Sequence, residues 1–223
     1  MPGGLSSAFH GIATVVCGIV GILHSDSARS VDGRCLTEMT NALAHRGPDA
    51  HGIYQGKGVG LGHRRLSVID LEGCLQPMQD QHAKRVITFN GEIYNFRDIK
   101  NELKSGCVKL STNSDTEVLV ETASTSNLNW IESLRGMFAF AVWFPQERKL
   151  LLARDRFGKK PLYYTVVGSS LLFSSEIKAF YKYPGFLPAV DYSKFSEFIA
   201  FRTSVGPETM LNNVREVPAG QRS

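Results

Sequence analysis

Three apolar runs between residues 137 and 167 constrain the fold of this chain more than any other feature. They read MFAFAVWF, KLLLARDRF and PLYYTVV, and each is short and rich in aromatic or aliphatic side chains, which favours β-strands. The polar segment PQERK joins the first two runs over a distance typical of a hairpin. We therefore predict an antiparallel meander with strands at 137–144, 149–157 and 161–167.

The rest of the chain alternates between predicted strands and predicted helices. Strands are expected at 18–23, at 85–91 and, as a pair around a tight turn, within 58–71. Amphipathic spacing and capping residues predict helices at 32–44, 96–104, 115–123, 128–135, 174–183 and 191–201. Strands, then helices, then strands again indicate an α+β fold with mainly antiparallel sheets covered by helices, in one domain over residues 17–223.

The segment before that domain has a different character. Its first twelve residues, MPGGLSSAFHGI, contain Gly, Ser and Pro without a hydrophobic period, which is typical of a disordered leader. Residues 1–16 contain no Lys or Arg, so a secretory signal peptide is not expected. We interpret residues 1–16 as a leader, a propeptide or a mis-assigned translation start.

Composition excludes several classes of function. The formal net charge of +4 is scattered along the chain, which argues against nucleic acid or an anionic membrane as a partner. No apolar run reaches the roughly 18 to 20 residues needed to span a bilayer. The four cysteines show no CxxC spacing, so neither a zinc site nor a disulfide framework is predicted. Small-molecule chemistry in the cytoplasm, without a metal, is the expectation.

Cys17, within ATVVCGIVGIL, has two interpretations. A cysteine in an apolar run is usually a small buried hydrophobe. Alternatively, its thiol is a nucleophile that is activated by its own α-amine, whose pKa of about 7.7 to 8 suits a base near neutral pH. That amine exists only if Cys17 is the first residue.

Polar loops elsewhere offer groups that could serve such a nucleophile. HRGPD and GHRRLS supply arginines, and the Arg65 guanidinium could bind a carboxylate with two hydrogen bonds. Asn90 and Gly91 could form an oxyanion hole, although Asn-Gly is also a common hairpin turn. Ser114 and Asp115 precede a predicted helix, where an N-cap would explain them equally well.

These motifs together resemble the N-terminal glutaminase domain of class II glutamine amidotransferases, an N-terminal-nucleophile family, and most closely its asparagine synthetase branch. The resemblance runs through CGIVGI, HRGPD, GHRRLSVID, QPM, FNGEIYN, SDTEV, GMFAFAVW, LLARDRFGKKPLYY and FSSEIKAF. It implies a four-layer αββα sandwich of two mainly antiparallel sheets. It also implies hydrolysis of glutamine to glutamate and ammonia through a cysteinyl thioester.

The resemblance assigns roles to particular residues. Cys17 would attack the side-chain amide of glutamine, while the side chain of Asn90 and the backbone N–H of Gly91 hold the oxyanion. The residues implied to bind the substrate are Arg65, Leu66, Val68, Glu92 and Asp115. No metal or cofactor is implied for this half-reaction, because ATP and magnesium would belong to a C-terminal synthetase domain that the 223 residues lack.

Two questions of organisation stay open at this stage. A free Cys17 requires either removal of residues 1–16 or translation from Val16 followed by loss of the initiator. Otherwise the chain is a truncated or non-catalytic glutamine-binding module. The partners that the resemblance allows are glutamine, a synthetase domain or subunit, and a second copy in a homodimer.

Overall fold

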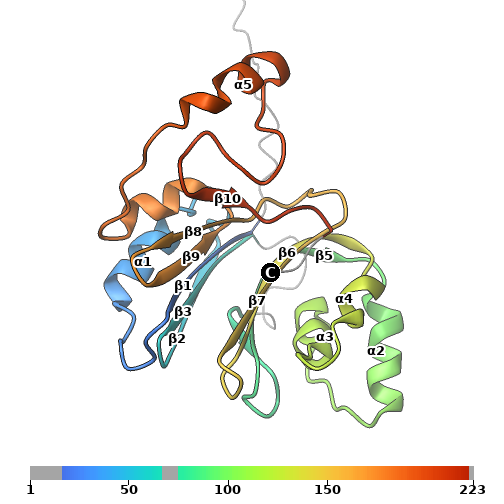
Figure 1. Ribbon diagram of the computed structural model, residues 1–223. Coiled ribbons are helices and arrows are strands. Elements are labelled where there is room, and N and C mark those ends of the chain that lie inside the picture. Colours follow the sequence, from blue (N-terminus) through green and yellow to red (C-terminus); the bar gives the residue numbers. More distant parts are fainter. Residues whose placement is uncertain (1–16, 67–74, 221–223) are drawn as a thin grey trace, which may run out of the picture.

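Two antiparallel sheets form the centre of the computed structural model, which describes residues 17–66 and 75–220 (Figure 1). The larger sheet has six strands, in the spatial order β10 (Val214–Glu216), β8 (Tyr163–Val167), β9 (Ser170–Ser174), β1 (Gly18–His24), β3 (Val59–Arg65) and β2 (Ala50–Gly56). The smaller sheet has four strands, in the order β4 (Met78–Gln79), β5 (Val86–Ile93), β6 (Gly136–Phe144) and β7 (Lys149–Arg154).

Helices cover the outer face of each sheet. The helices of the described chain are α1 (Gly33–Asn41), α2 (Phe96–Ser105), α3 (Asp115–Thr122), α4 (Asn129–Ser133), α5 (Phe195–Phe201) and the 3-10 helices η1 (Ile177–Lys182) and η2 (Tyr192–Lys194). Of these, α5 projects from the top of the molecule and does not cover a sheet (Figure 1). Figure 1 shows α1 on one side of the two sheets and α2, α3 and α4 on the other. None of these helices is long and apolar enough to cross a membrane.

Side-chain alternation along the strands explains this layering. In β1 the side chain of Ile19 packs between the sheets, whereas that of Val20 packs under α1. In β5 Val86 faces the inter-sheet core, whereas Ile87 packs against the α2 and α3 layer. Three hydrophobic cores therefore separate four layers, and the predicted αββα sandwich is confirmed.

The predicted meander is only partly correct. The hairpin of β6 and β7 is confirmed, but β8 pairs with β9 and β10 in the other sheet. The cause is the buried carboxylate of Asp155, which accepts hydrogen bonds from the backbone N–H groups of Phe157, Lys159 and Lys160. These bonds fold the chain into a compact loop after β7, and the chain then continues in the six-stranded sheet.

Several boundaries also differ from the predictions. The strand expected at 85–91 continues to Ile93, so the Asn-Gly pair lies within a strand and the hairpin-turn interpretation is wrong. The helix expected at 174–183 is instead η1, preceded by β9, which the sequence did not reveal. Strands β2, β4 and β10 were missed as well. The second strand expected within 58–71 lies largely outside the described residues, and the segment 1–16 lies wholly outside them.

Candidate active site

Cys17 lies immediately before β1, beside the end of β3. The antiparallel register pairs Gly18 with Arg64, so the start of one strand adjoins the end of the other. The Cys17 Sγ atom accordingly lies 4.0 Å from the carbonyl oxygen of Leu66. Cys17 is partly buried rather than sealed in the core, so the thiol remains available for chemistry.

The environment of this thiol favours its neutral form. Burial raises the pKa of Cys17 above its ordinary value, while hydrogen bonding to the Leu66 backbone and the charges of Arg65 and Lys160 oppose the rise. Because only the thiolate is strongly nucleophilic, the thiol needs a base close to it at neutral pH.

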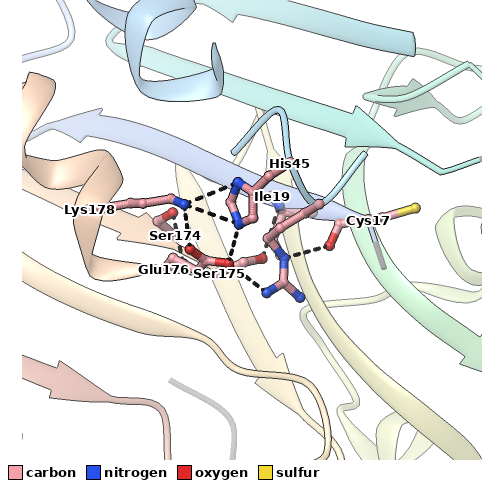
Figure 2. Close-up of polar contacts among 8 residues, drawn as sticks. Cys17, Ile19, His45, Ser174, Ser175, Glu176 and Lys178 are labelled. Carbon is pink, nitrogen blue, oxygen red and sulfur yellow. Dashed lines mark hydrogen bonds and ion pairs between the residues drawn. The ribbon is translucent and has the colours of Figure 1, made fainter. Parts of the chain in front are cut away.

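The backbone of Cys17 is held by the HRGPD loop. Arg46 Nε donates a hydrogen bond of 3.1 Å to the carbonyl oxygen of Cys17, and Arg46 Nη1 lies 2.8 Å from Glu176 Oε1. Glu176 also contacts His45 and Lys178 (Figure 2). Although burial alone would raise the pKa of Glu176, these three donors lower it to about 2. Figure 2 shows the sulfur of Cys17 pointing away from this cluster.

The HRGPD loop can approach β3 closely because its third residue is glycine. A Cβ atom at Gly47 would lie 2.5 Å from the backbone nitrogen of Arg65, a distance that no side chain tolerates. The N–H of Asp49 then donates to the carbonyl oxygen of Arg65 at 3.1 Å. The loop that binds the Cys17 carbonyl is thus fixed to the strand that carries Arg65.

Asn90 lies on the face of β5 that looks into the inter-sheet space. Two residues earlier on the same face, Thr88 Oγ1 donates to the carbonyl oxygen of Gly62 in β3 at 3.2 Å. Asn90 is 1% exposed, and neither its amide nitrogen nor its amide oxygen has a hydrogen-bond partner in the described structure. A buried amide without partners is costly, and a ligand that hydrogen-bonds to Asn90 would offset that cost.

The neighbouring backbone N–H of Gly91 is open as well. Phe138 lies opposite Gly91, and both of its backbone groups bind Asp155: its carbonyl oxygen accepts from the Asp155 N–H, and its N–H donates to Asp155 Oδ2. The groups of Phe138 thus point away from β5, so the alternation of the ladder points the Gly91 N–H away from β6. On that side the N–H of Phe89 donates to Gln76 Oε1 at 2.6 Å, and the N–H of Ile93 donates to Asp115 Oδ2 at 3.1 Å. Between these two, the Gly91 N–H has no acceptor within the described ranges.

Only glycine fits at that position. Gly91 has φ +155°, and a Cβ atom there would lie 2.1 Å from the carbonyl oxygen of Met137 on β6. A side chain would therefore push β5 away from β6, and the open N–H would move with it.

Asp115 begins α3 and faces the same strand edge. The N-cap of the helix is Ser114, whose hydroxyl accepts from the Thr116 N–H at 3.0 Å. Asp115 instead accepts from Ile93, and burial raises its pKa, partly offset by the N–H groups of Ile93 and Thr116. The negative charge of exposed Glu92 raises the pKa of Asp115 further, so the two carboxylates lie within electrostatic range of each other.

Residues 16–223 match a family model described as a glutamine amidotransferase domain. The chain belongs to this family. It is 35% identical over 209 residues to asparagine synthetase [glutamine-hydrolyzing] 1 of Bacillus subtilis, covering 93% of this chain and 33% of that protein. It is 37% identical over 205 residues to asparagine synthetase 3 of the same organism, covering 91% and 33%. The chain thus spans about a third of the length of these relatives.

Solved structures support the same fold. An allosteric regulatory enzyme of purine biosynthesis superimposes with a TM-score of 0.62 at 23% identity, over 74% of this chain and 43% of that one. Glutamine phosphoribosylpyrophosphate amidotransferase from B. subtilis gives a TM-score of 0.62 at 23% identity, over 78% and 45%. The two-sheet α+β architecture is therefore that of glutamine amidotransferases.

Within this glutamine amidotransferase domain, the predicted site residues come from both sheets. Cys17, Arg65 and Leu66 belong to the six-stranded sheet or its ends, whereas Asn90, Gly91 and Glu92 lie on β5. His63 joins the two, because its Nε2 lies 3.1 Å from the carbonyl oxygen of Phe89. Val68 lies outside the described residues. No group of His, Cys, Asp and Glu that could hold a metal ion occurs in the part of the domain that is described.

Sequence reasoning missed two charged residues close to the candidate site. Arg46 was visible only as a loop arginine, because nothing in HRGPD indicates that it reaches the Cys17 carbonyl. Lys160 follows the Asp155 loop, and its charge acts on Cys17. Burial and the charge of Arg46 lower the pKa of Lys160, and the charges of Cys17, Asp155 and Glu92 oppose this shift. The two adjacent lysines of the FGKK segment are a signal that could have drawn attention to Lys160.

Proposed function

We propose that this chain hydrolyses glutamine to glutamate and ammonia through a thioester on Cys17, as the ammonia-supplying part of an asparagine-synthetase-like amidotransferase. One observation carries the proposal. The buried amide of Asn90 has no partner, and the adjacent N–H of Gly91 has no acceptor, within the residues that are described. Two open donors on neighbouring residues are what an oxyanion needs.

The chemistry begins at the thiol of Cys17. Its α-amine accepts the thiol proton while Sγ attacks the side-chain amide carbon of glutamine. The resulting oxyanion accepts hydrogen bonds from Asn90 Nδ2 and the Gly91 N–H. As the C–N bond breaks, the α-ammonium returns the proton to the departing nitrogen, which leaves as ammonia. Water then attacks the thioester, releases glutamate and restores the thiol.

The remaining groups orient the substrate. The guanidinium of Arg65 binds the α-carboxylate of glutamine, with backbone groups of Leu66 and Val68 completing that side. The carboxylates of Asp115 and Glu92 receive the α-ammonium. Asp115 is already fixed by the Ile93 N–H at 3.1 Å, so it holds the ammonium in a set position relative to the oxyanion donors on the same strand.

The molecule that accepts the ammonia would be determined by another domain or subunit. The relatives named asparagine synthetase are about three times as long as the matched region, so we place the use of ammonia, with ATP and magnesium, in a synthetase domain or subunit. Cytoplasmic location and a homodimer are further expectations of this proposal.

A second candidate is a non-catalytic glutamine-binding module. It is favoured by the peptide bond between Val16 and Cys17 in the 223-residue sequence, because that bond converts the required amine into an amide that cannot act as a base.

Two chains decide between these candidates. The 17–223 chain, with Cys17 as its first residue, and the 1–223 chain are incubated with glutamine, and glutamate and ammonia are measured. The proposal expects turnover by the 17–223 chain and none after Cys17→Ala, while Cys107→Ala, a change at an exposed thiol, leaves turnover intact. A folded 17–223 chain that releases neither product overturns the enzymatic function.

A further inference from the structure

Gln76 uses both ends of its side-chain amide to connect two elements of the site. Its Oε1 accepts a hydrogen bond of 2.6 Å from the backbone N–H of Phe89 in β5. Its Nε2 lies 3.3 Å from Thr116 Oγ1 in the first turn of α3. Phe89 directly precedes Asn90, and Thr116 directly follows Asp115, so a single side chain spans the oxyanion strand and the helix that carries the ammonium-binding carboxylate.

The Gln76 backbone is fixed against the other sheet. A Cβ atom at Gly52 of β2 would lie 2.0 Å from the carbonyl oxygen of Gln76. The backbone at residue 76 therefore packs directly on the six-stranded sheet, while its side chain binds the four-stranded one. Movement of β5 relative to β2 would have to break one of these contacts.

Gln76 lies just beyond the end of the β4–β5 ladder. The backbone pairing stops at Met78, opposite Ile87, and Pro77 has no N–H to continue it. In that register residue 76 falls opposite Phe89, where a side-chain oxygen replaces the backbone acceptor. A backbone strand continued past this point would supply an acceptor to the Gly91 N–H and close it to substrate.

We propose that Gln76 is a positioning residue of the glutaminase site, which sets β5 and α3 relative to each other and leaves the Gly91 N–H open for the oxyanion. This inference rests on the proposed function. Gln76 touches neither substrate nor nucleophile in this role. Its loss acts through Asn90, Gly91 and Asp115.

The test compares four variants of the 17–223 chain. Gln76→Met keeps the length of the side chain but removes both hydrogen bonds, so kcat should fall about 10- to 100-fold, the effect of a small misplacement of catalytic groups. Gln76→Glu retains an acceptor for Phe89 and should recover most of the lost kcat. Thr116→Val breaks only the connection to α3 and should raise KM with little loss of kcat. Gln79→Met, an exposed residue on β4, is the matched control.

The outcomes distinguish a failure of the proposed function from a failure of the positioning role of Gln76. An inactive parent chain overturns the proposed function. An active parent with an equally active Gln76→Met variant overturns the positioning role. Amide hydrogen exchange gives a readout independent of turnover, because the Phe89 N–H should exchange faster in Gln76→Met and stay protected in Gln76→Glu. Equal loss of kcat in Gln76→Met and Gln76→Glu, with Phe89 still protected in the latter, also contradicts the proposal.

Discussion

Arg46 binds the carbonyl oxygen of Cys17 through Nε at 3.1 Å, while its Nη1 lies 2.8 Å from Glu176. The carbonyl, the thiol-bearing side chain and the backbone nitrogen of Cys17 share one Cα atom. Fixing the carbonyl therefore restricts the directions in which the sulfur and the nitrogen can point. Glu176 in turn is held by three cationic or imidazole groups, so the orientation of Cys17 is set by a cluster built from the HRGPD and SSEIK segments.

Arg46→Lys should impair the enzyme although it preserves the charge. One ammonium group cannot reproduce the geometry in which a guanidinium binds Cys17 and Glu176 together. We expect kcat for ammonia release to fall about 10- to 100-fold, with the fold retained. Arg34→Lys, at a side chain that is 87% exposed, should leave kcat unchanged. Equal kcat values for the two variants would show that the Cys17 carbonyl needs no such support.

Asn90→Ala should lower kcat without a parallel loss of stability. Loss of an oxyanion donor costs about 10²- to 10³-fold in kcat. Stability should not fall in parallel, because the buried Asn90 amide has no protein partner in the described structure to lose and its burial carries a desolvation penalty of about 1 to 3 kcal/mol. Urea unfolding of both chains measures the free energy. A marked destabilisation by Asn90→Ala would mean that the amide has a structural role instead.

The sequence predicted the residues proposed to act on the substrate better than the residues that hold them in position. Asn90 and Gly91 are adjacent in the chain, so their shared role needs no tertiary information. By contrast, the partner of Arg46 is the start of β1, which only the folding of the HRGPD loop onto β3 brings near. Gln76 was visible only as part of QPM, because its role depends on where β4 ends.

The strand errors have a similar origin. The run 161–167 has the local character of a strand, and it is one, but composition does not say which sheet it joins. That choice follows from the buried Asp155 carboxylate and its N–H donors after β7. Ser114 and Asp115 were equally suited to cap α3, and only the structure shows that Ser114 does so while Asp115 turns to β5.

His63 should make the domain sensitive to acid. Burial lowers its pKa from 6.5 to about 4, with the Arg65 charge acting in the same direction and the bond to the Phe89 carbonyl opposing it. Between pH 6.5 and 4 the unfolded chain therefore binds a proton that the folded chain does not. Stability is lost as pH falls through this window, by up to about 3 kcal/mol from this group.

His63→Gln tests this pH dependence. Glutamine can still donate to the Phe89 carbonyl but does not titrate, so the free energy of unfolding should decline less between pH 6.5 and 4. Exposed His82 provides the matched control, and His82→Gln should follow the parent chain. If the free energy of unfolding declined equally with pH in the parent and in His63→Gln, His63 would be ruled out as the source of acid sensitivity.

Lys160→Gln should make the Cys17 thiol harder to ionise. The charge of Lys160 opposes the effect of burial on this thiol, so its removal raises the pKa of Cys17. The measurement is the rate of alkylation by iodoacetamide against pH, followed at each cysteine by peptide mass spectrometry. The 1–223 chain is used, because its Cys17 nitrogen is an amide and no α-amine titrates beside the sulfur.

The midpoint of the curve of Cys17 alkylation rate against pH should move to higher pH in Lys160→Gln but not in Lys149→Gln, whose exposed side chain lies on β7. Cys35, whose pKa burial raises to about 11, serves as an internal reference that neither change should move. An unshifted Cys17 midpoint would mean that solvent screens Lys160 from the sulfur.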